Sequence, residues 1–128
     1  MKILLDTHAL IWMDTDPTQL SATAVACFND PANDIWLSVV SVWEVVIKVG
    51  TGKLALSGDI DQIVRDIQAQ NPLQLLDIQY PHALAVRGLP PIHRDPFDRM
   101  LVAQALVENA TILTCDANIR RYPVMTIW

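Results

Sequence analysis

The sequence predicts an α/β fold with a parallel sheet that helices cover on both faces. Two observations lead to this prediction. Short apolar runs that suit buried strands alternate along the chain with longer helical patterns. The strand-like runs are apolar throughout, as expected of parallel strands buried on both faces. With 128 residues, 52% of them hydrophobic and 18% charged, the chain fits one folded domain, residues 1–128, with a real core.

The first half of the chain is divided by helix starts and stops. Ser21 fits an N-cap, Asn29-Asp30-Pro31 ends the helix that follows, and Gly50 terminates a mostly apolar helix. Gly52 and Gly58 flank a loop. In order, we expect a strand at residues 2–5, a helix at 8–13, a helix at 21–28, a strand at 35–38 and a helix at 39–49.

The second half opens with the clearest amphipathic helix, at residues 59–70. Its apolar residues Ile60, Ile63, Val64 and Ile67 follow the i, i+3, i+4, i+7 spacing of one helix face. After it we expect, in order, a strand at 73–78, a helix at 81–87, a stiff proline loop at 89–91, a helix at 96–109, a strand at 111–114, a short helix near 117 and a strand at 124–127.

Four carboxylates, Asp6, Glu44, Asp98 and Asp116, lie where an apolar stretch ends or a helix begins. In open parallel sheets, ligands bind beyond the carboxyl ends of the strands. Asp6 and Asp116 directly follow strand-like runs, and the other two lie in helices that follow or pack beside strands. We therefore expect all four at one edge of the sheet. Acids among apolar residues are costly unless their charge is compensated, and a bound cation is the simplest compensation.

Helix capping is the alternative explanation for each acid. Ser41-Val42-Trp43-Glu44 matches a capping box, Asp95-Pro96 matches an N-cap followed by N1, and Asp6 and Asp116 each precede a helix. Capping explains Asp95 completely. It explains Glu44 poorly, because the chain has only two glutamates and this one lies within an apolar segment. The explanations are also compatible, since helix N-termini that meet at one site stabilise clustered negative charge.

The formal net charge of −5 at first argues against a nucleic-acid partner. However, if metal neutralises all four acids, a net charge of only −1 remains. Four arginines also lie near the last two acids in the sequence: Arg94, Arg99, Arg120 and Arg121. A basic rim around an acidic pit suits a phosphate backbone. Arg94 and Arg99 are the candidates for phosphate contacts, with simple surface solvation as the alternative.

The cysteines and the N-terminus indicate the compartment. Cys27 and Cys115 have no partner motif and are expected to be free thiols, with one disulfide between them as the alternative. Asp6 and His8 interrupt what would be the apolar region of a signal peptide. No stretch is long and apolar enough for a membrane span. A soluble, cytoplasmic protein without membrane contact is expected.

The remaining aromatic and imidazole side chains receive mostly structural interpretations. Trp12, Trp36 and Trp43 are expected in the core, and His82 on the surface. His93 lies in a loop, where we expect a local hydrogen bond, with a contact to a substrate phosphate as the alternative.

Four segments together resemble a known family, the PIN-domain ribonucleases. They contain Leu5-Asp6-Thr7-His8-Ala9, Ser41-Val42-Trp43-Glu44, His93-Arg94-Asp95-Pro96-Phe97-Asp98-Arg99 and Thr114-Cys115-Asp116. Within that family the chain is most similar to the VapC toxins of type II toxin–antitoxin systems. The resemblance implies a three-layer α/β/α sandwich with a central, mainly parallel sheet, endoribonuclease activity on RNA, a homodimer and inhibition by a cognate antitoxin protein.

The resemblance also implies metal-assisted hydrolysis of phosphodiester bonds. Asp6, Asp98 and Asp116 would hold Mg²⁺ (or Mn²⁺), because this hard cation prefers carboxylate oxygen. Glu44 would hold a second ion or orient the attacking water. Asn118 would add a ligand or hold Asp116 in place.

Three other functions compete with this hypothesis. A non-catalytic PIN-like module that binds a partner or RNA would keep the acids as caps. A phospho-acceptor domain of the response-regulator type needs a late lysine, and none follows Lys53. A phosphatase with an Asp-x-Asp nucleophile does not fit, because Asp6-Thr7-His8 lacks the second aspartate.

Overall fold

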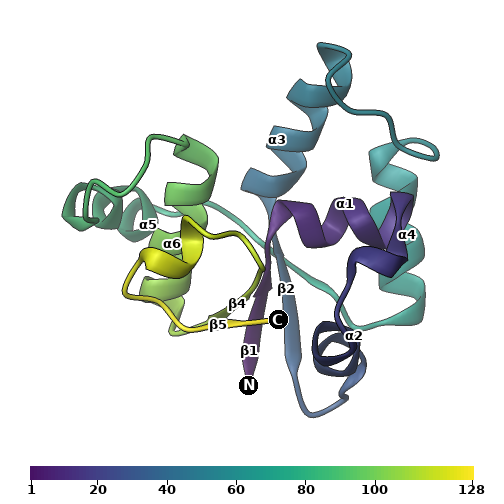
Figure 1. The fold of residues 1–128 in the computed structure, drawn as a ribbon, viewed down its shortest axis with the longest axis horizontal. Coiled ribbons are helices and arrows are strands. Elements are labelled where there is room, and N and C mark those ends of the chain that lie inside the picture. The colour runs from purple at the N-terminus through teal and green to yellow at the C-terminus, as the bar shows by residue number, and fades with distance from the viewer.

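A five-stranded parallel sheet lies at the centre of the molecule, with helices on both of its faces (Figure 1). The computed structural model describes residues 1–128 and confirms the expected three-layer α/β/α sandwich. The strands are β1 (Lys2–Leu5), β2 (Asp34–Ser38), β3 (Gln74–Leu76), β4 (Thr111–Leu113) and β5 (Thr126–Ile127). The α-helices are α1 (Thr7–Thr15), α2 (Ala22–Asn29), α3 (Val39–Gly50), α4 (Ile60–Gln70), α5 (Tyr80–Ala85) and α6 (Pro96–Glu108).

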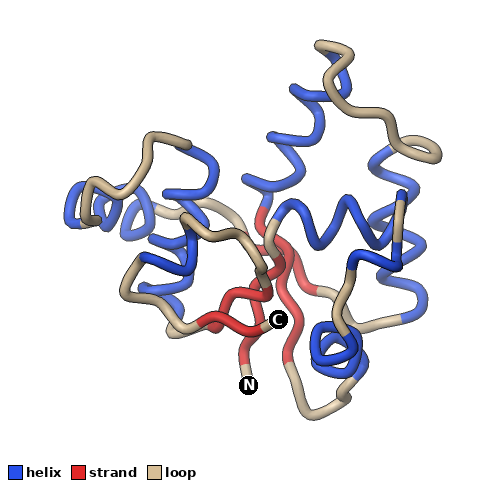
Figure 2. Tube along the Cα trace, viewed as in Figure 1, coloured by secondary structure: helices blue, strands red, loops and turns tan.

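The sheet order is β3-β2-β1-β4-β5, and every neighbouring pair is parallel. Leu4 of β1 pairs with Trp36 of β2 on one side and with Ile112 of β4 on the other. Figure 2 shows the strands gathered between two groups of helices. From β1 the chain adds β2 and β3 in one direction and then returns to add β4 and β5 in the other. Such a reversal opens a crevice at the carboxyl ends of the strands beside it, here β1 and β4.

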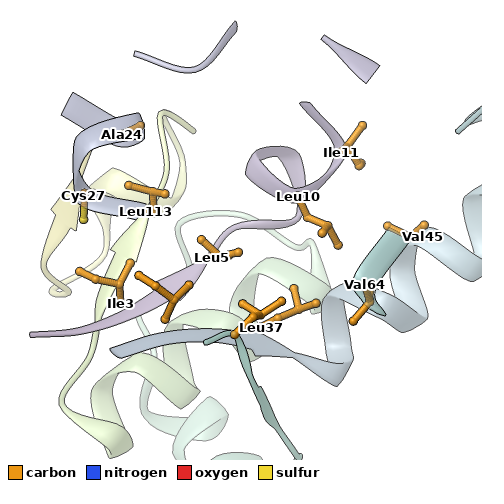
Figure 3. Packing of buried hydrophobic residues seen from close by; sticks show 12 residues of the cluster. Ile3, Leu5, Leu10, Ile11, Ala24, Cys27, Leu37, Val45, Val64 and Leu113 are labelled. Atoms are coloured by element: carbon orange, nitrogen blue, oxygen red, sulfur yellow. The ribbon is translucent and has the colours of Figure 1, made fainter. Parts of the chain in front are cut away.

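The residues of β1 point alternately into two cores, one on each face of the sheet. Ile3 and Leu5 pack with residues of α1, α2 and α4, whereas Leu4 packs with residues of α6. Helix α3 contributes to both cores, Val45 to the first and Val40 to the second. Figure 3 shows the first core, where helix side chains surround those of the sheet. Truncation of any of the three β1 residues to alanine is expected to cost about 2–5 kcal/mol.

Every predicted strand and helix is present, although several bounds differ. The strand predicted at 73–78 pairs only over Gln74–Leu76. Its neighbour β2 ends at Ser38, the residue that pairs with Leu76, because α3 begins at the next residue. The strand predicted at 124–127 pairs only over Thr126–Ile127, alongside the short β4. Two predicted helical segments include 3₁₀ turns, Val86–Gly88 after α5 and Ile119–Arg121 near residue 117.

The predicted capping box at the start of α3 is wrong. The N-cap is Ser38, whose side chain accepts the N–H of Val40, because β2 runs into α3 without a loop. Ser41 lies inside the helix, fully buried, and accepts a hydrogen bond from the Thr7 hydroxyl at 2.9 Å. Glu44 is therefore in the second turn of α3 and has no role at its N-terminus.

Two burial predictions are also wrong, and one prediction about the cysteines is confirmed. Trp43 is 57% exposed on α3 and does not belong to the core. His82 is fully buried, because α5 packs against α6 and the imidazole Nε2 meets Glu108 Oε1 at 2.8 Å. Cys27 and Cys115 are both free thiols. None of the helices has the length and apolar character needed to cross a bilayer.

Candidate functional site

Asp6 lies at the carboxyl end of β1, where its backbone continues the ladder to β4 through a hydrogen bond to Leu113 O. Its carboxylate caps α1 by accepting the His8 N–H at 3.3 Å, and its second oxygen accepts the Thr114 hydroxyl at 2.5 Å. The residue is only 2% exposed. Burial raises the pKa of Asp6, and the bond from Thr114 opposes that rise only partly. The charged form is therefore costly in the absence of a cation.

Thr114 connects Asp6 to Asp116 across the crevice. Its hydroxyl donates to Asp6 and accepts the backbone N–H of Asp116 at 3.0 Å. One oxygen of Asp116, Oδ1, accepts the backbone N–H groups of Asn118 and Ile119 at 2.8 and 2.9 Å, which leaves Oδ2 free of protein hydrogen bonds. Asn118 thus holds Asp116 through its backbone, and the residue itself is exposed.

Asp98 lies in the first turn of α6, which Asp95 caps by accepting the N–H groups of Phe97 and Asp98 at 2.9 and 3.0 Å. The Asp98 carboxylate meets His93 Nε2 at 3.0 Å. Burial raises the pKa of Asp98 to about 6, the nearby negative charges of Asp95, Asp6 and Asp116 add to the rise, and the His93 bond opposes it. Asp98 therefore shares one electrostatic environment with the acids of β1 and β4.

A chain of hydrogen bonds stands behind Asp98. Arg99 Nη1 donates to the hydroxyl of the buried Tyr122 at 3.0 Å, and this hydroxyl meets His93 Nδ1 at 2.8 Å. Because an ionised carboxylate can only accept, the imidazole nitrogen that faces Asp98, Nε2, is the one that carries a proton. In the neutral imidazole Nδ1 then accepts, and the Tyr122 hydroxyl donates to it while accepting from Arg99. Arg99 Nη1 also donates to Pro90 O at 2.9 Å, which fixes the loop before α6.

Glu44 approaches from α3 and is 3% exposed. Its Oε2 pairs with Lys48 Nζ at 2.5 Å, whereas its buried Oε1 has no hydrogen-bond partner. The bond from Glu44 raises the pKa of Lys48, and the negative charges of Asp95 and Asp98 raise it further. Lys48 is thus a cation at the edge of this acidic site. The i, i+4 spacing from Glu44 would have revealed it in the sequence.

The carboxylates come together as an electrostatic cluster and not as a formed set of metal ligands. No group of three or more histidine, cysteine, aspartate or glutamate side chains is arranged to hold an ion. Each acid is instead turned toward a local donor: Asp6 to Thr114, Asp98 to His93, Glu44 to Lys48 and Asp116 to backbone N–H groups. The donor set still fits Mg²⁺, because carboxylate oxygens are its preferred ligands and the orphaned Glu44 Oε1 demands a partner.

Two hollows flank the acids. One, of about 190 Å³, is lined by Asp6, His8, Trp12, Cys115 and Asp116. The other, of about 470 Å³, adjoins Asp98 only through His93, which contacts that acid. It is lined by residues of the loop before α6 together with two arginines: Pro91, Ile92, His93, Arg94 and Arg99. Arg94 is exposed there, whereas the guanidinium of Arg99 is engaged in the hydrogen bonds described above. The site thus has an acidic, aromatic side and a basic side.

The sequence reasoning missed three supporting residues, Thr114, Tyr122 and Lys48. Thr114 lies two residues before Asp116 and received no role of its own, because only the pairing of β1 with β4 brings it to Asp6. Tyr122 lies far along the chain from His93 and reaches it because the 3₁₀ turn Ile119–Arg121 folds back over α6. The contacts of Thr114 and Tyr122 depend on tertiary packing and carry no local signal, whereas the i, i+4 spacing of Lys48 from Glu44 is a local one.

Comparison with known proteins gives one family and a consistent set of folds. The family model described as PIN domain matches residues 3–125. No curated protein matches the chain. Similar solved chains occur in the structure of VapBC2 from Rickettsia felis bound to a DNA fragment from its promoter (19% identity, TM-score 0.66, covering 99% of this chain and 98% of that one). Others occur in VapBC-1 from nontypeable Haemophilus influenzae (19%, 0.61, 99% and 97%) and in FitAcB from Neisseria gonorrhoeae (17%, 0.55, 98% and 96%).

Proposed function

Because this chain belongs to the PIN-domain family, we propose that it is a metal-dependent endoribonuclease that hydrolyses RNA phosphodiester bonds. One observation carries the proposal. Burial raises the pKa of both Asp6 and Asp98, and the charge of Asp116 adds to the rise in each case. Three acids with this mutual repulsion at the switch point of a parallel sheet form a site whose charge a divalent cation would compensate.

Asp6, Asp98 and Asp116 are the residues that would hold Mg²⁺ or Mn²⁺, and Glu44 would hold a second ion or orient the attacking water through its unpartnered Oε1. A bound ion of this kind lowers the pKa of a water ligand and stabilises the charge that develops on the phosphoryl oxygens. Thr114 keeps the Asp6 carboxylate turned toward the crevice. The His93 bond occupies only Oδ2 of Asp98, so Oδ1 would be the oxygen that holds the ion.

The rest of the site serves the substrate backbone. Arg94 is exposed in the basic hollow beside Asp98, so its guanidinium is free to contact a phosphate next to the scissile bond. Arg99 lines the same hollow and would contribute its positive charge while it holds the loop before α6. Asn118 would keep Asp116 in place through the backbone N–H.

The test is incubation of the purified chain with total cellular RNA in Mg²⁺, in Mn²⁺ and in chelator, followed by sequencing of new 5′ ends. Asp98→Asn is the test variant, and Asp34→Asn is the matched control, because Asp34 is exposed at the opposite end of the sheet. We expect discrete metal-dependent cuts that only Asp98→Asn abolishes. Intact RNA from folded wild-type protein in every condition would overturn the proposal.

We further propose that the chain is the toxin of a type II toxin–antitoxin pair and acts as a homodimer in the cytoplasm. The similar folds in VapBC-1 and VapBC2 support this placement. So does helix α3, which exposes a row of large apolar side chains of the kind that protein partners cover: Trp43, Val46, Ile47 and Val49. Expression of the wild type should arrest growth, and Asp98→Asn should not. Co-expression of a cognate antitoxin protein should restore growth.

A second function, a non-catalytic module that binds a partner or RNA, is favoured by one feature of the site. Every acid already has a local partner, and Asp6 and Asp116 serve as caps. The same RNA incubation separates the two functions, because a module of this kind would bind RNA without cutting it under any metal condition.

A further inference from the structure

The smaller hollow beside the acids has a wall made of aromatic rings. His8 and Trp12 are four residues apart on α1 and therefore lie on the same helix face. Their ring centroids are 5.5 Å apart with planes inclined by 43°. The hollow of about 190 Å³ that they line also contains Asp6, Cys115 and Asp116. Two aromatic surfaces thus adjoin the carboxylates directly.

Local structure fixes these rings in place. The Asp6 carboxylate caps α1 through the His8 N–H, so the start of the helix and the first acid are set by the same contact. The Trp12 ring also packs edge-on against Trp128, with centroids 5.8 Å apart, and against the core, so packing holds it in place. His8 is exposed, and neither its ring nor the indole N–H of Trp12 makes a hydrogen bond within the protein. The polar edges of both rings are therefore available to a ligand.

The charges around the site decide what enters this hollow. Two carboxylates line it, so a phosphate would be repelled there. The basic hollow with Arg94 is lined by none of the four acids and suits the phosphate backbone. The ligand that fits an aromatic wall next to carboxylates, within reach of a scissile phosphate, is a neutral nucleobase.

We propose that His8 and Trp12 form a nucleobase subsite, in which an unpaired base next to the scissile phosphate stacks on Trp12 and meets the edge of His8. The inference rests on the proposed ribonuclease function and adds a requirement to it. The RNA must be single-stranded, or its base turned out of a helix, on one side of the cut. Stacking tolerates any base. The subsite therefore requires that a base be present at this position and does not select which base it is.

The experiment uses a short oligoribonucleotide that contains a mapped cut site, together with versions that carry one abasic residue at each position near the cut. We expect a single flanking position at which base removal slows cleavage by wild-type protein roughly tenfold to a hundredfold, the usual effect of losing one stacked base. Trp12→Leu should slow the intact substrate to a similar degree and should show no further loss with the abasic one. Leucine keeps the apolar contacts of Trp12 with the core.

Two further variants and a second readout make the test specific. His8→Ala should show a smaller loss at the same position, since only the edge contact is removed and the backbone N–H of residue 8 still donates to the Asp6 cap. Tyr80→Leu removes an exposed aromatic ring on α5 and should leave the abasic effect unchanged. Fluorescence anisotropy in chelator measures binding of the same oligonucleotides without cleavage and should show the same pattern.

The outcomes separate this inference from the proposed function. If wild-type protein cleaves RNA, but base removal has an equal effect in wild type and in Trp12→Leu, the subsite is overturned and the ribonuclease stands. If the protein cleaves no RNA, the ribonuclease fails, and anisotropy with an unstructured oligoribonucleotide and its abasic versions, in wild type and in Trp12→Leu, still supports or refutes the base contact. Binding that favours a partner peptide over RNA at this hollow would also overturn the inference.

Discussion

Ionisation of Asp98 at neutral pH is costly, because its carboxylate is buried and lies near other negative charges. Burial raises its pKa from the ordinary value of 3.8 to about 6, with further increases from Asp95, Asp6 and Asp116. Because the folded-state pKa is raised, the folded protein binds this proton more tightly than the unfolded chain. Metal-free protein should therefore lose stability as the pH rises from about 4 to about 6, by roughly 3 kcal/mol at most from this group.

Asp98→Asn should remove that loss. The amide has no charge to bury, and its oxygen can still accept the His93 Nε2–H bond. In chelator at pH 7.5 we expect the variant to have a larger free energy of unfolding than wild type, and we expect the gap to close below pH 4. Urea denaturation at a series of pH values measures this. A variant that is less stable than wild type at pH 7.5 would mean that the charge is compensated inside the protein.

Tyr122→Phe tests the hydrogen bonds behind Asp98. The change deletes the hydroxyl that joins Arg99 to His93 and frees the imidazole to take its other tautomer. We expect a stability loss of about 1 kcal/mol and a larger relative loss of kcat/KM, because Asp98 is no longer held in one orientation. Tyr80→Phe, at an exposed site, is the matched control. Equal kcat/KM in Tyr122→Phe and wild type would limit the role of the hydroxyl to packing.

At the scale of the element, the N-terminus of α6 positions Asp98. The Asp95 carboxylate caps this helix, and removal of such a cap costs typically about 1 kcal/mol. Asp95→Ala should lower stability by this amount and should also lower cleavage, because the first turn that carries Asp98 frays. Asp59→Ala removes the equivalent cap of α4, which carries none of the four acids. It should lower stability without changing cleavage, as measured by thermal unfolding and by cleavage rate.

The sequence predicted best those elements whose signal is local. The strand β1 and the helix α4 were found from an apolar run and from a helical repeat. The N-cap of α3 was misplaced because the capping-box pattern at Ser41 ignores that β2 leads directly into the helix. The predicted bounds of β3 and β5 are too long. The length of each strand depends on how far its neighbour pairs with it, and the sequence of one strand alone does not show that extent.

At the scale of the whole molecule, the reversal of strand order beside β1 gathers acids from distant segments. The positions of these acids, after strands or in helices beside them, were enough to predict that they lie at one edge of the sheet. The partners of each carboxylate were not predictable in this way. Thr114 meets Asp6 only through the register of β4, and Tyr122 reaches His93 only after the C-terminal segment folds over α6. Whether the four acids act together in catalysis stays a prediction.

A bound divalent ion would link β1, β4, α6 and α3, so it should stabilise the whole fold. A ligand at a hundred times its Kd adds about 2.7 kcal/mol to the free energy of unfolding. For a chain of this size that corresponds to a rise in Tm of roughly 10 °C. We expect Mg²⁺ or Mn²⁺ to produce such a rise in wild type, and we expect it to be lost in Asp6→Asn and Asp98→Asn.

The control for this thermal-shift experiment is again Asp34→Asn, which should respond to the ion as wild type does.

Glu44→Gln distinguishes the two roles proposed for Glu44. If Glu44 holds an ion, the variant should lose part of the shift. If it orients water, the variant should keep the shift and lose cleavage. An equal rise in Tm in every aspartate variant would show that the ion binds elsewhere. The raised pKa of Asp98 would then be a cost of its burial and of the neighbouring negative charges, without a metal to offset it.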